Sequence, residues 1–230
     1  MVFFHTALAW VSLTLLSFLA AAGGADSTNL PIVHSCPNTS ISVLAESRID
    51  YAEICAGAED GIAFFGRLPL EPIDSVLVEI VQVLPEEAGD TAVGCYLEDD
   101  QRILVLDFAK FAKQKTWFNV PIDQSMYRSL VTHEVAHAVA ACNMAMPESP
   151  IQAKEYLAYV AMFAMMDQRL RGQILDANPC KAFDRESKIN ATIYLCDPMR
   201  FAVRAYRHYL GKKNGDEFLL KIMSGEALAD

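Results

Sequence analysis

Two histidines and a glutamate in the middle of the chain have the types and the spacing of a metal site. The segment His133-Glu134-Val135-Ala136-His137 places two imidazoles four residues apart. On a helix both rings project from one face and can bind one tetrahedral zinc ion. Glu134 follows about 100° round the helix, where a general base for a zinc-bound water has to stand. The spacing therefore predicts a zinc site with its own base.

The sequence around this motif indicates a buried helix. Leu130-Val131-Thr132 precedes the motif and Ala138-Val139-Ala140-Ala141 follows it, so nearly every side of the helix is apolar. The alternative is a pair of solvated surface histidines. Uncoordinated imidazoles are costly in apolar surroundings, however, and a metal ion satisfies both. We therefore interpret His133 and His137 as metal ligands.

A catalytic zinc needs a third protein ligand, which we expect from a second helix. Ser149-Pro150-Ile151-Gln152 has the pattern of an N-cap with proline at the first helical position, and this helix is expected to run to about Arg171. Glu155 near its start can return beneath the imidazoles and is the predicted ligand. Glu148 is the alternative, but it sits in the turn. Tyr159 on the same helix either orients an imidazole or belongs to the core.

The pairing of His-Glu-x-x-His with a glutamate on the next helix resembles the gluzincins, a group of zinc metallopeptidases. Residues 201–225 form a helix, a glycine turn and a second helix ending at a glycine, similar to the tail of the peptidase MA-like gluzincins. The resemblance covers about residues 120–228. It implies a small zincin-like catalytic domain in which a sheet backs the metal helix and one strand edge can hold an extended peptide.

Two features depart from that family's patterns. The Gly-x-Met-x-Asn motif of the gluzincin aminopeptidases does not occur ahead of His133, so a site for the amino terminus of a substrate is not supported. Lys154, rather than the asparagine usual in thermolysin-like enzymes, precedes Glu155. The resemblance therefore implies the metal chemistry and leaves the substrate open.

The resemblance also implies a tyrosine or histidine, after the glutamate helix, that stabilises the oxyanion of the reaction. Tyr194, Tyr206 and His208 are the candidates. On a helix whose apolar centre includes Met199 and Leu210, His208 projects away and is expected to be solvated, whereas Tyr206 falls in the packing seam. Tyr194 precedes this helix in a loop bracketed by cysteines. It is the predicted catalytic tyrosine.

The first 22 residues are predominantly apolar and end in three alanines, which is typical of a secretory signal peptide. Cleavage is expected after Ala22 or Ala25. Because no lysine or arginine stands at the front, an uncleaved N-terminal anchor is the alternative. No later run is long and uncharged enough to span a bilayer. The sequence thus predicts a signal peptide at residues 1–22 and a single domain at residues 23–230, secreted or periplasmic.

All six cysteines follow the predicted signal, and an even number on an export route predicts three disulfides. If neighbours in sequence pair, the bonds join Cys36 to Cys55, Cys95 to Cys142 and Cys180 to Cys196.

Hydrophobic periodicity predicts the elements that carry the site. An amphipathic helix is expected from residue 47 to 65, and three short β-branched runs predict strands at 75–84, 91–97 and 102–107. A short helix follows near residues 108–115, and Asp123 is a plausible N-cap for the metal helix. The expected fold is α+β, with a three-stranded sheet backing the buried metal-binding helix and a mostly helical C-terminal half.

Taken together, the sequence predicts an exported zinc metallopeptidase that holds one Zn²⁺ per chain and acts on a peptide or protein substrate. His133, His137 and Glu155 are the expected ligands and Glu134 the general base. The alternative is a non-catalytic zinc-binding or assembly protein on a gluzincin-like scaffold. The net charge of −10 is not opposed by a basic cluster, so neither nucleic acid nor an anionic membrane surface is expected as a partner.

Overall fold

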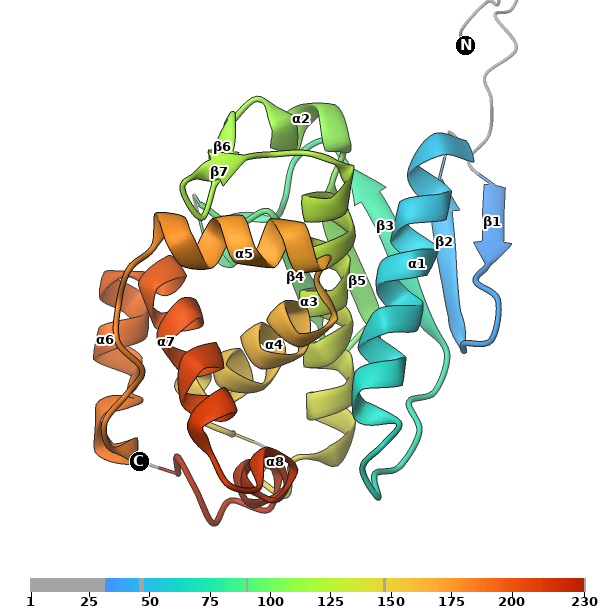
Figure 1. Ribbon diagram of the computed structural model, residues 1–230. Helices are drawn as coiled ribbons and strands as arrows, with labels where there is room; N and C mark the ends of the chain where they lie inside the picture. Colours follow the sequence, from blue (N-terminus) through green and yellow to red (C-terminus); the bar gives the residue numbers. More distant parts are fainter. Residues whose placement is uncertain (1–31, 46–47, 90, 147, 230) are drawn as a thin grey trace, which may run out of the picture. The chain divides into compact units, whose positions relative to one another are not determined.

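Helices and strands alternate in the first half of the computed structural model, and helices dominate the second (Figure 1). The structure describes residues 32–45, 48–89, 91–146 and 148–229, apart from the side chains of residues 48–50. The predicted signal peptide lies outside these residues. The strands are β1 (Ile32–Ser35), β2 (Ile41–Ala45), β3 (Val76–Val81), β4 (Gly94–Leu97), β5 (Arg102–Leu106), β6 (Thr116–Trp117) and β7 (Val120–Pro121). The α-helices are α1 (Arg48–Phe65), α2 (Phe108–Ala112), α3 (Gln124–Asn143), α4 (Ile151–Met165), α5 (Gln168–Ala177), α6 (Ala191–Cys196), α7 (Pro198–Gly211) and α8 (Gly215–Met223), with 3-10 turns η1 (Glu86–Ala88) and η2 (Glu186–Lys188).

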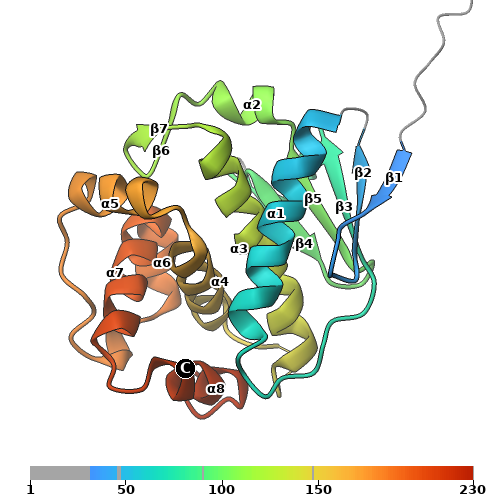
Figure 2. The ribbon, with the colours of Figure 1, turned by 45° about the vertical axis from the view of Figure 1, so that its right-hand side comes forward.

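Within the described residues, five strands form one mixed sheet in the order β1-β2-β3-β5-β4. Strands β2, β3 and β5 are parallel, while β1 and β4 pair antiparallel at the two edges. The buried residues Val43, Val78 and Val105 alternate with less buried ones, so one face of the sheet is apolar. Helices α1 and α3 cover that face (Figures 1 and 2).

The mixture of helices and sheet agrees with the sequence prediction, but the three-stranded sheet was wrong. Strands β3, β4 and β5 lie within the three predicted ranges, while β1 and β2 were not predicted. Each of these two has at most five residues, and a β-strand of that length is defined by its pairing partners more than by its own sequence.

Helices α1 and α3 approach closely because two glycines face the contact. A Cβ on Gly57 would lie 2.5 Å from the carbonyl oxygen of Arg128, and one on Gly61 would lie 2.7 Å from Cγ1 of Val135. Both distances are shorter than any side chain tolerates. Arg128 also joins the two helices through an ion pair of 2.6 Å with Asp60. The two glycines, which weaken the helix prediction locally, are therefore explained by packing.

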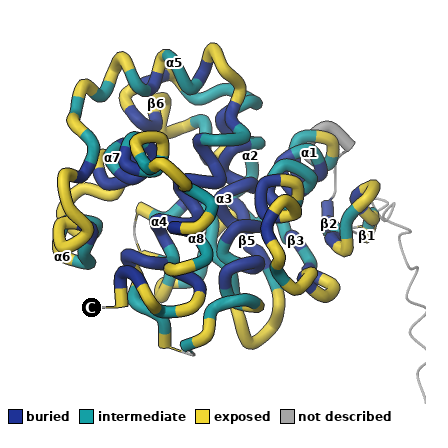
Figure 3. The backbone as a smooth tube through the Cα atoms, turned by 60° about the horizontal axis from the view of Figure 1, so that its bottom comes forward, coloured by how far each residue is buried: buried dark blue, intermediate teal, exposed yellow. Residues whose placement is uncertain are grey.

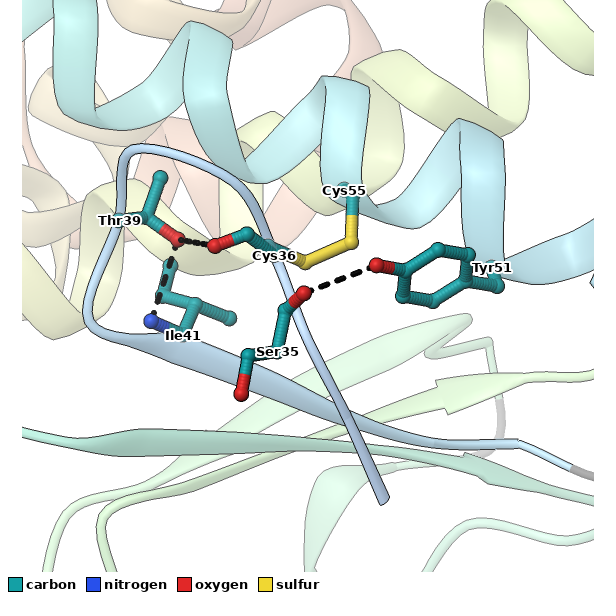
Figure 4. Close-up of a disulfide and its surroundings, with 6 residues drawn as sticks. All are labelled: Ser35, Cys36, Thr39, Ile41, Tyr51 and Cys55. Carbon is teal, nitrogen blue, oxygen red and sulfur yellow. Dashed lines mark hydrogen bonds between the residues drawn. A yellow bond between two sulfur atoms is a disulfide. The ribbon is translucent and has the colours of Figure 1, made fainter. Parts of the chain in front are cut away.

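A disulfide between Cys36 and Cys55 ties the loop after β1 to α1 (Figure 4). Near it, the Tyr51 hydroxyl donates a hydrogen bond of 2.8 Å to the carbonyl oxygen of Ser35. The Cys36–Cys55 disulfide confirms one of the three predicted disulfides. It anchors the edge strand β1 to the helical layer.

The other two predicted disulfides were wrong, since Cys95, Cys142, Cys180 and Cys196 are free thiols. Gly94 faces α3, so the next residue of the strand, Cys95, points to the opposite side of the sheet, while Cys142 is exposed on the last turn of α3. Cys180 packs against the core, whereas Cys196 is exposed at the end of α6. Closeness in sequence was therefore a poor guide to pairing for these four cysteines.

Helix α3 begins where the sequence predicted, because the Asp123 carboxylate accepts a hydrogen bond of 2.9 Å from the Met126 amide. Most of the helix is buried, as is α4 beside it (Figure 3). Among the described residues, no helix has the length and apolar character needed to cross a membrane.

The start and the end of α4 differ from the prediction. Ser149 does not cap the helix but bonds the Met146 carbonyl, and Pro150 stands at the cap position without a side-chain bond. The helix ends at Met165 instead of Arg171. Asp167 then caps a separate helix, α5, by accepting a hydrogen bond from the Leu170 amide. The helical periodicity of the sequence continues across this break, which is why the periodicity did not reveal it.

Candidate metal centre

Helix α3 carries both histidines of the motif on the face that meets α4. The Nε2 atoms of His133 and His137 lie 3.0 Å apart, and their rings are nearly perpendicular at 84°. His133 is 7% exposed and Glu134 is 4% exposed, so these two residues are buried as the sequence predicted, while His137 is partly buried. A spacing of four residues thus directs two imidazole nitrogens to one point.

Glu155 on α4 supplies the third group at that point. Its Oε2 lies 3.6 Å from Nε2 of His133, and its Oε1 lies 3.6 Å from Nε2 of His137. These candidate ligand atoms all lie within 4.8 Å of one another, so the three side chains could hold a metal ion. Glu148, the alternative considered from the sequence, is exposed in the turn before α4. The structure therefore places Glu155, and not Glu148, beside the two histidines.

The distances fit a tetrahedral metal. With zinc bonds of about 2.0 to 2.1 Å, two ligand atoms at the tetrahedral angle stand about 3.4 Å apart. The 3.0 Å and 3.6 Å separations lie on either side of that value. Within the described residues, the buried Oε2 of Glu155 has no hydrogen-bond donor, a condition that is costly unless another group satisfies it. A cation bound by all three residues would do so.

Burial sets the protonation of these groups. It lowers the pKa of His133 well below the ordinary value, with a smaller effect from His137, and it lowers the pKa of His137 to about 4, assisted by the nearby charge of Lys154. Both imidazoles are therefore neutral at pH 7, which is the form that binds metals. Burial also raises the pKa of Glu155 to about 7, partly opposed by a hydrogen bond with Tyr194.

Glu134 lies against the edge strand of the sheet rather than among the three ligand atoms. The burial of its carboxyl group raises its pKa well above the ordinary value, and the charge of Glu155 raises it further. The Glu134 carboxylate is close to the Cα of Gly94 in β4. The Glu134 carboxyl group thus borders the cluster that could hold a metal ion, and burial makes it more basic than an exposed glutamate.

The cluster opens into a cleft of about 620 Å³. Its wall combines residues of η1, β4, α3, α4 and α6, including Gly94, Tyr96, Lys154 and Tyr194. Lys154 forms an ion pair of 3.7 Å with Glu98, which follows β4. The cleft is large enough for several residues of a peptide, and both histidines line it.

Tyr194 lies in this cleft, on the short helix α6 instead of the predicted loop. A hydrogen bond links its phenol group to the Glu155 carboxylate, and burial, followed by the charge of Glu155, raises the pKa of Tyr194. The phenol is therefore protonated and can donate a hydrogen bond. Tyr159 packs its ring 4.5 Å from the ring of His133 and is buried among Phe118 and Phe201.

The prediction of a solvated His208 was wrong. His208 is 9% exposed, and its Nδ1 lies 2.8 Å from the Tyr156 hydroxyl, so α7 turns this histidine toward α4. Met199 and Leu210, taken from the sequence as the apolar centre of the helix, are instead 37% and 59% exposed. Tyr206 is a core residue, as expected, and stacks on Phe163 at 5.3 Å.

Comparison with known proteins places the chain in a group defined by sequence. A model described as "Family of unknown function (DUF6639)" matches residues 41–230. The chain belongs to this family. No curated protein matches the chain, and no solved structure does so. The family match includes all the elements that line the cleft, from η1 to α7, and leaves Cys36 outside.

Two residues of the cleft wall were not recognised from the sequence as part of a site. Gly94 was seen only as part of a strand, although a glycine inside a strand pattern often marks the close approach of another group. Lys154 was seen only as a neighbour of Glu155. Its position in the cleft depends on the rotation of α4, which the sequence does not specify.

Proposed function

We propose that this chain is a zinc-dependent metallopeptidase of the gluzincin type. The observation that carries the proposal is the convergence of His133, His137 and Glu155 at one point of a cleft, with Glu134 buried beside them. The residue types and spacing are those of a catalytic zinc site with three protein ligands.

The roles of the residues follow from their positions. Zinc held by His133, His137 and Glu155 would polarise the carbonyl of a peptide bond and lower the pKa of a bound water. Glu134 accepts the proton of the attacking water and returns it to the leaving amine. Tyr194, whose phenol is protonated in the cleft, donates a hydrogen bond to the developing oxyanion.

The edge strand β4 supports a peptide as the substrate. The Leu106 amide donates a hydrogen bond of 3.0 Å to the Val93 carbonyl, so in this antiparallel pair Val93 and Cys95 are bonded to β5. The N–H and C=O groups of Gly94 and Tyr96 consequently point away from β5, toward the open edge. An extended peptide could pair with them and pass beside the two histidines.

Export is part of the proposal. The Cys36–Cys55 disulfide supports it, because such bonds persist in oxidising compartments outside the cytosol. The apolar sequence of residues 1–22 agrees with this.

The proposal is tested on the purified full-length chain. We expect about one zinc ion per chain, hydrolysis of an unstructured protein, loss of hydrolysis after removal of the metal by a chelator, and recovery when zinc is added back. A chain that binds zinc and does not hydrolyse would instead be a zinc-binding or assembly protein. A chain that binds no zinc would contradict both readings.

A further inference from the structure

Gly94, in the edge strand β4, lies directly against the side chain of Glu134. A Cβ on this glycine would stand 2.6 Å from Oε1, 2.9 Å from Cδ and 2.9 Å from Cγ of Glu134. All three nearest atoms belong to that one side chain. Any residue other than glycine would therefore compete with Glu134 for the same space.

The backbone does not require a glycine at this position. The glycines with positive φ are Gly89 and Gly225 among the described residues, and Gly94 is not one of them. A glycine inside a strand weakens the strand, since it has no side chain to pack and loses more conformational freedom on folding. The reason for Gly94 thus has to be space, and the space is filled by Glu134.

Neither partner in this contact can move away freely. Glu134 is 4% exposed on a helix that is buried on most sides, and a Cβ at position 94 would push its carboxyl group from its present place toward the cleft that it lines. Strand β4 is fixed by its pairing with β5. A methyl group at position 94 would displace either the carboxylate or the strand edge.

We infer that Gly94 is a positioning residue, whose missing side chain fixes the place of the Glu134 carboxylate between β4 and the metal-binding cluster. The catalytic consequence rests on the proposed function, whereas the steric contact does not. A shift of about 1 Å in a group that transfers a proton lowers the rate by about 10²-fold. The geometry at Gly94 would therefore govern the rate of hydrolysis without any contact between Gly94 and the metal.

The first test measures the contact without activity, in metal-free full-length protein. Gly94→Ala should lower the midpoint of thermal unfolding by roughly 2 to 10 °C, as expected for an overpacked site in a chain of this size. In a Glu134→Ala background, where the competing atoms are absent, the same change should have almost no effect. The difference between the shifts in unfolding midpoint that Gly94→Ala causes in the two backgrounds measures the contact. An equal effect of Gly94→Ala in both backgrounds would overturn the inference.

The second test measures the consequence for the reaction. Gly94→Ala should keep the zinc content of the wild-type protein and lower kcat by about 10²-fold, with a much smaller change in KM. Gly172→Ala is the matched control, because a Cβ on Gly172 meets no atom within 4 Å, and this change should alter neither quantity. An unchanged kcat in Gly94→Ala would overturn the positioning role. If the wild-type chain shows no zinc-dependent hydrolysis, the proposed function fails, while the unfolding comparison still decides on the contact.

Discussion

At the scale of single residues, burial determines which protons must leave before a metal can bind. His133 and His137 are neutral at pH 7 because burial lowers their pKa values, so they need to release no proton. Glu155 differs, since burial raises its pKa to about 7. The site in the metal-free protein therefore exchanges a proton on a carboxyl group, not on an imidazole, near neutral pH.

This difference predicts how zinc affinity depends on pH. Below pH 7 the Glu155 carboxyl is protonated and must lose its proton to bind zinc, so affinity should fall as pH falls, by up to about tenfold per pH unit. Protonation of His137 should add to the loss only near pH 4. Competition with a coloured chelator between pH 5.5 and 8 measures the slope, and Glu155→Gln should reduce it. An affinity that stays constant over this range would contradict the assignment.

The choice of Glu155 over Glu148 can be tested separately. Glu155→Ala removes one of the three expected ligands. Loss of a residue that only hydrogen-bonds to a ligand lowers metal affinity by roughly 10- to 100-fold, so the loss of a ligand itself should lower zinc affinity by at least that much. Glu148→Ala is the control, since Glu148 is exposed in the preceding turn. This variant should bind zinc as tightly as the wild type does. Zinc titration of both variants decides between them. A reversed order would show that the third ligand is misassigned.

Tyr194 has a predicted role that does not involve metal retention. Tyr194→Phe removes the phenol hydroxyl that faces Glu155 and should lower kcat by about 10²- to 10³-fold, as when one oxyanion donor is lost, while the zinc content stays the same. Tyr206→Phe is the control because Tyr206 stacks on Phe163 in the core. Steady-state kinetics and metal analysis of the two variants give the answer. Equal activity in Tyr194→Phe and wild type would exclude the role.

At the scale of elements, sequence patterns identified the parts whose signals are local. The cap at Asp123 and the four-residue spacing of the histidines depend on adjacent residues, and both were read correctly. The rotation of α7 was misread because hydropathy gives little weight to alanine and histidine, whereas the structure buries Ala202, Ala205 and His208. Ring packing and a hydrogen bond to Tyr156 hold His208 inward, and neither is visible in a single helix.

The contact of α1 with α3 carries a prediction about stability. Gly57→Ala should reduce the free energy of unfolding by about 1 to 3 kcal/mol, because the added Cβ would meet backbone and Val131 atoms that cannot withdraw. Gly172→Ala, in an open position on α5, should be neutral or stabilising by up to about 1 kcal/mol. Urea unfolding monitored by fluorescence compares the two. Equal stability of Gly57→Ala and wild type would mean that the two helices can separate at little cost.

At the scale of the whole molecule, the cleft joins parts of the chain that are far apart in sequence. Strand β4 and helices α3, α4 and α6 all line it, and His133, Glu155 and Tyr194 come from three different helices. The motif predicted two of the three side chains that meet in the cluster, the expected start of a second helix predicted Glu155, and resemblance to a family supplied Tyr194. Gly94 could not be found in this way, because its importance arises only when β4 and α3 are packed together.

The central claim is that Glu134 transfers a proton in a reaction that zinc at this cleft makes possible. The most direct measurement is the zinc content and the rate of hydrolysis of an unstructured protein for Glu134→Gln beside the wild type. Glutamine has nearly the same shape and cannot accept the proton, so the variant should keep about one zinc per chain and lose activity by a factor of about 10² to 10⁴. Full activity in zinc-loaded Glu134→Gln would contradict the account.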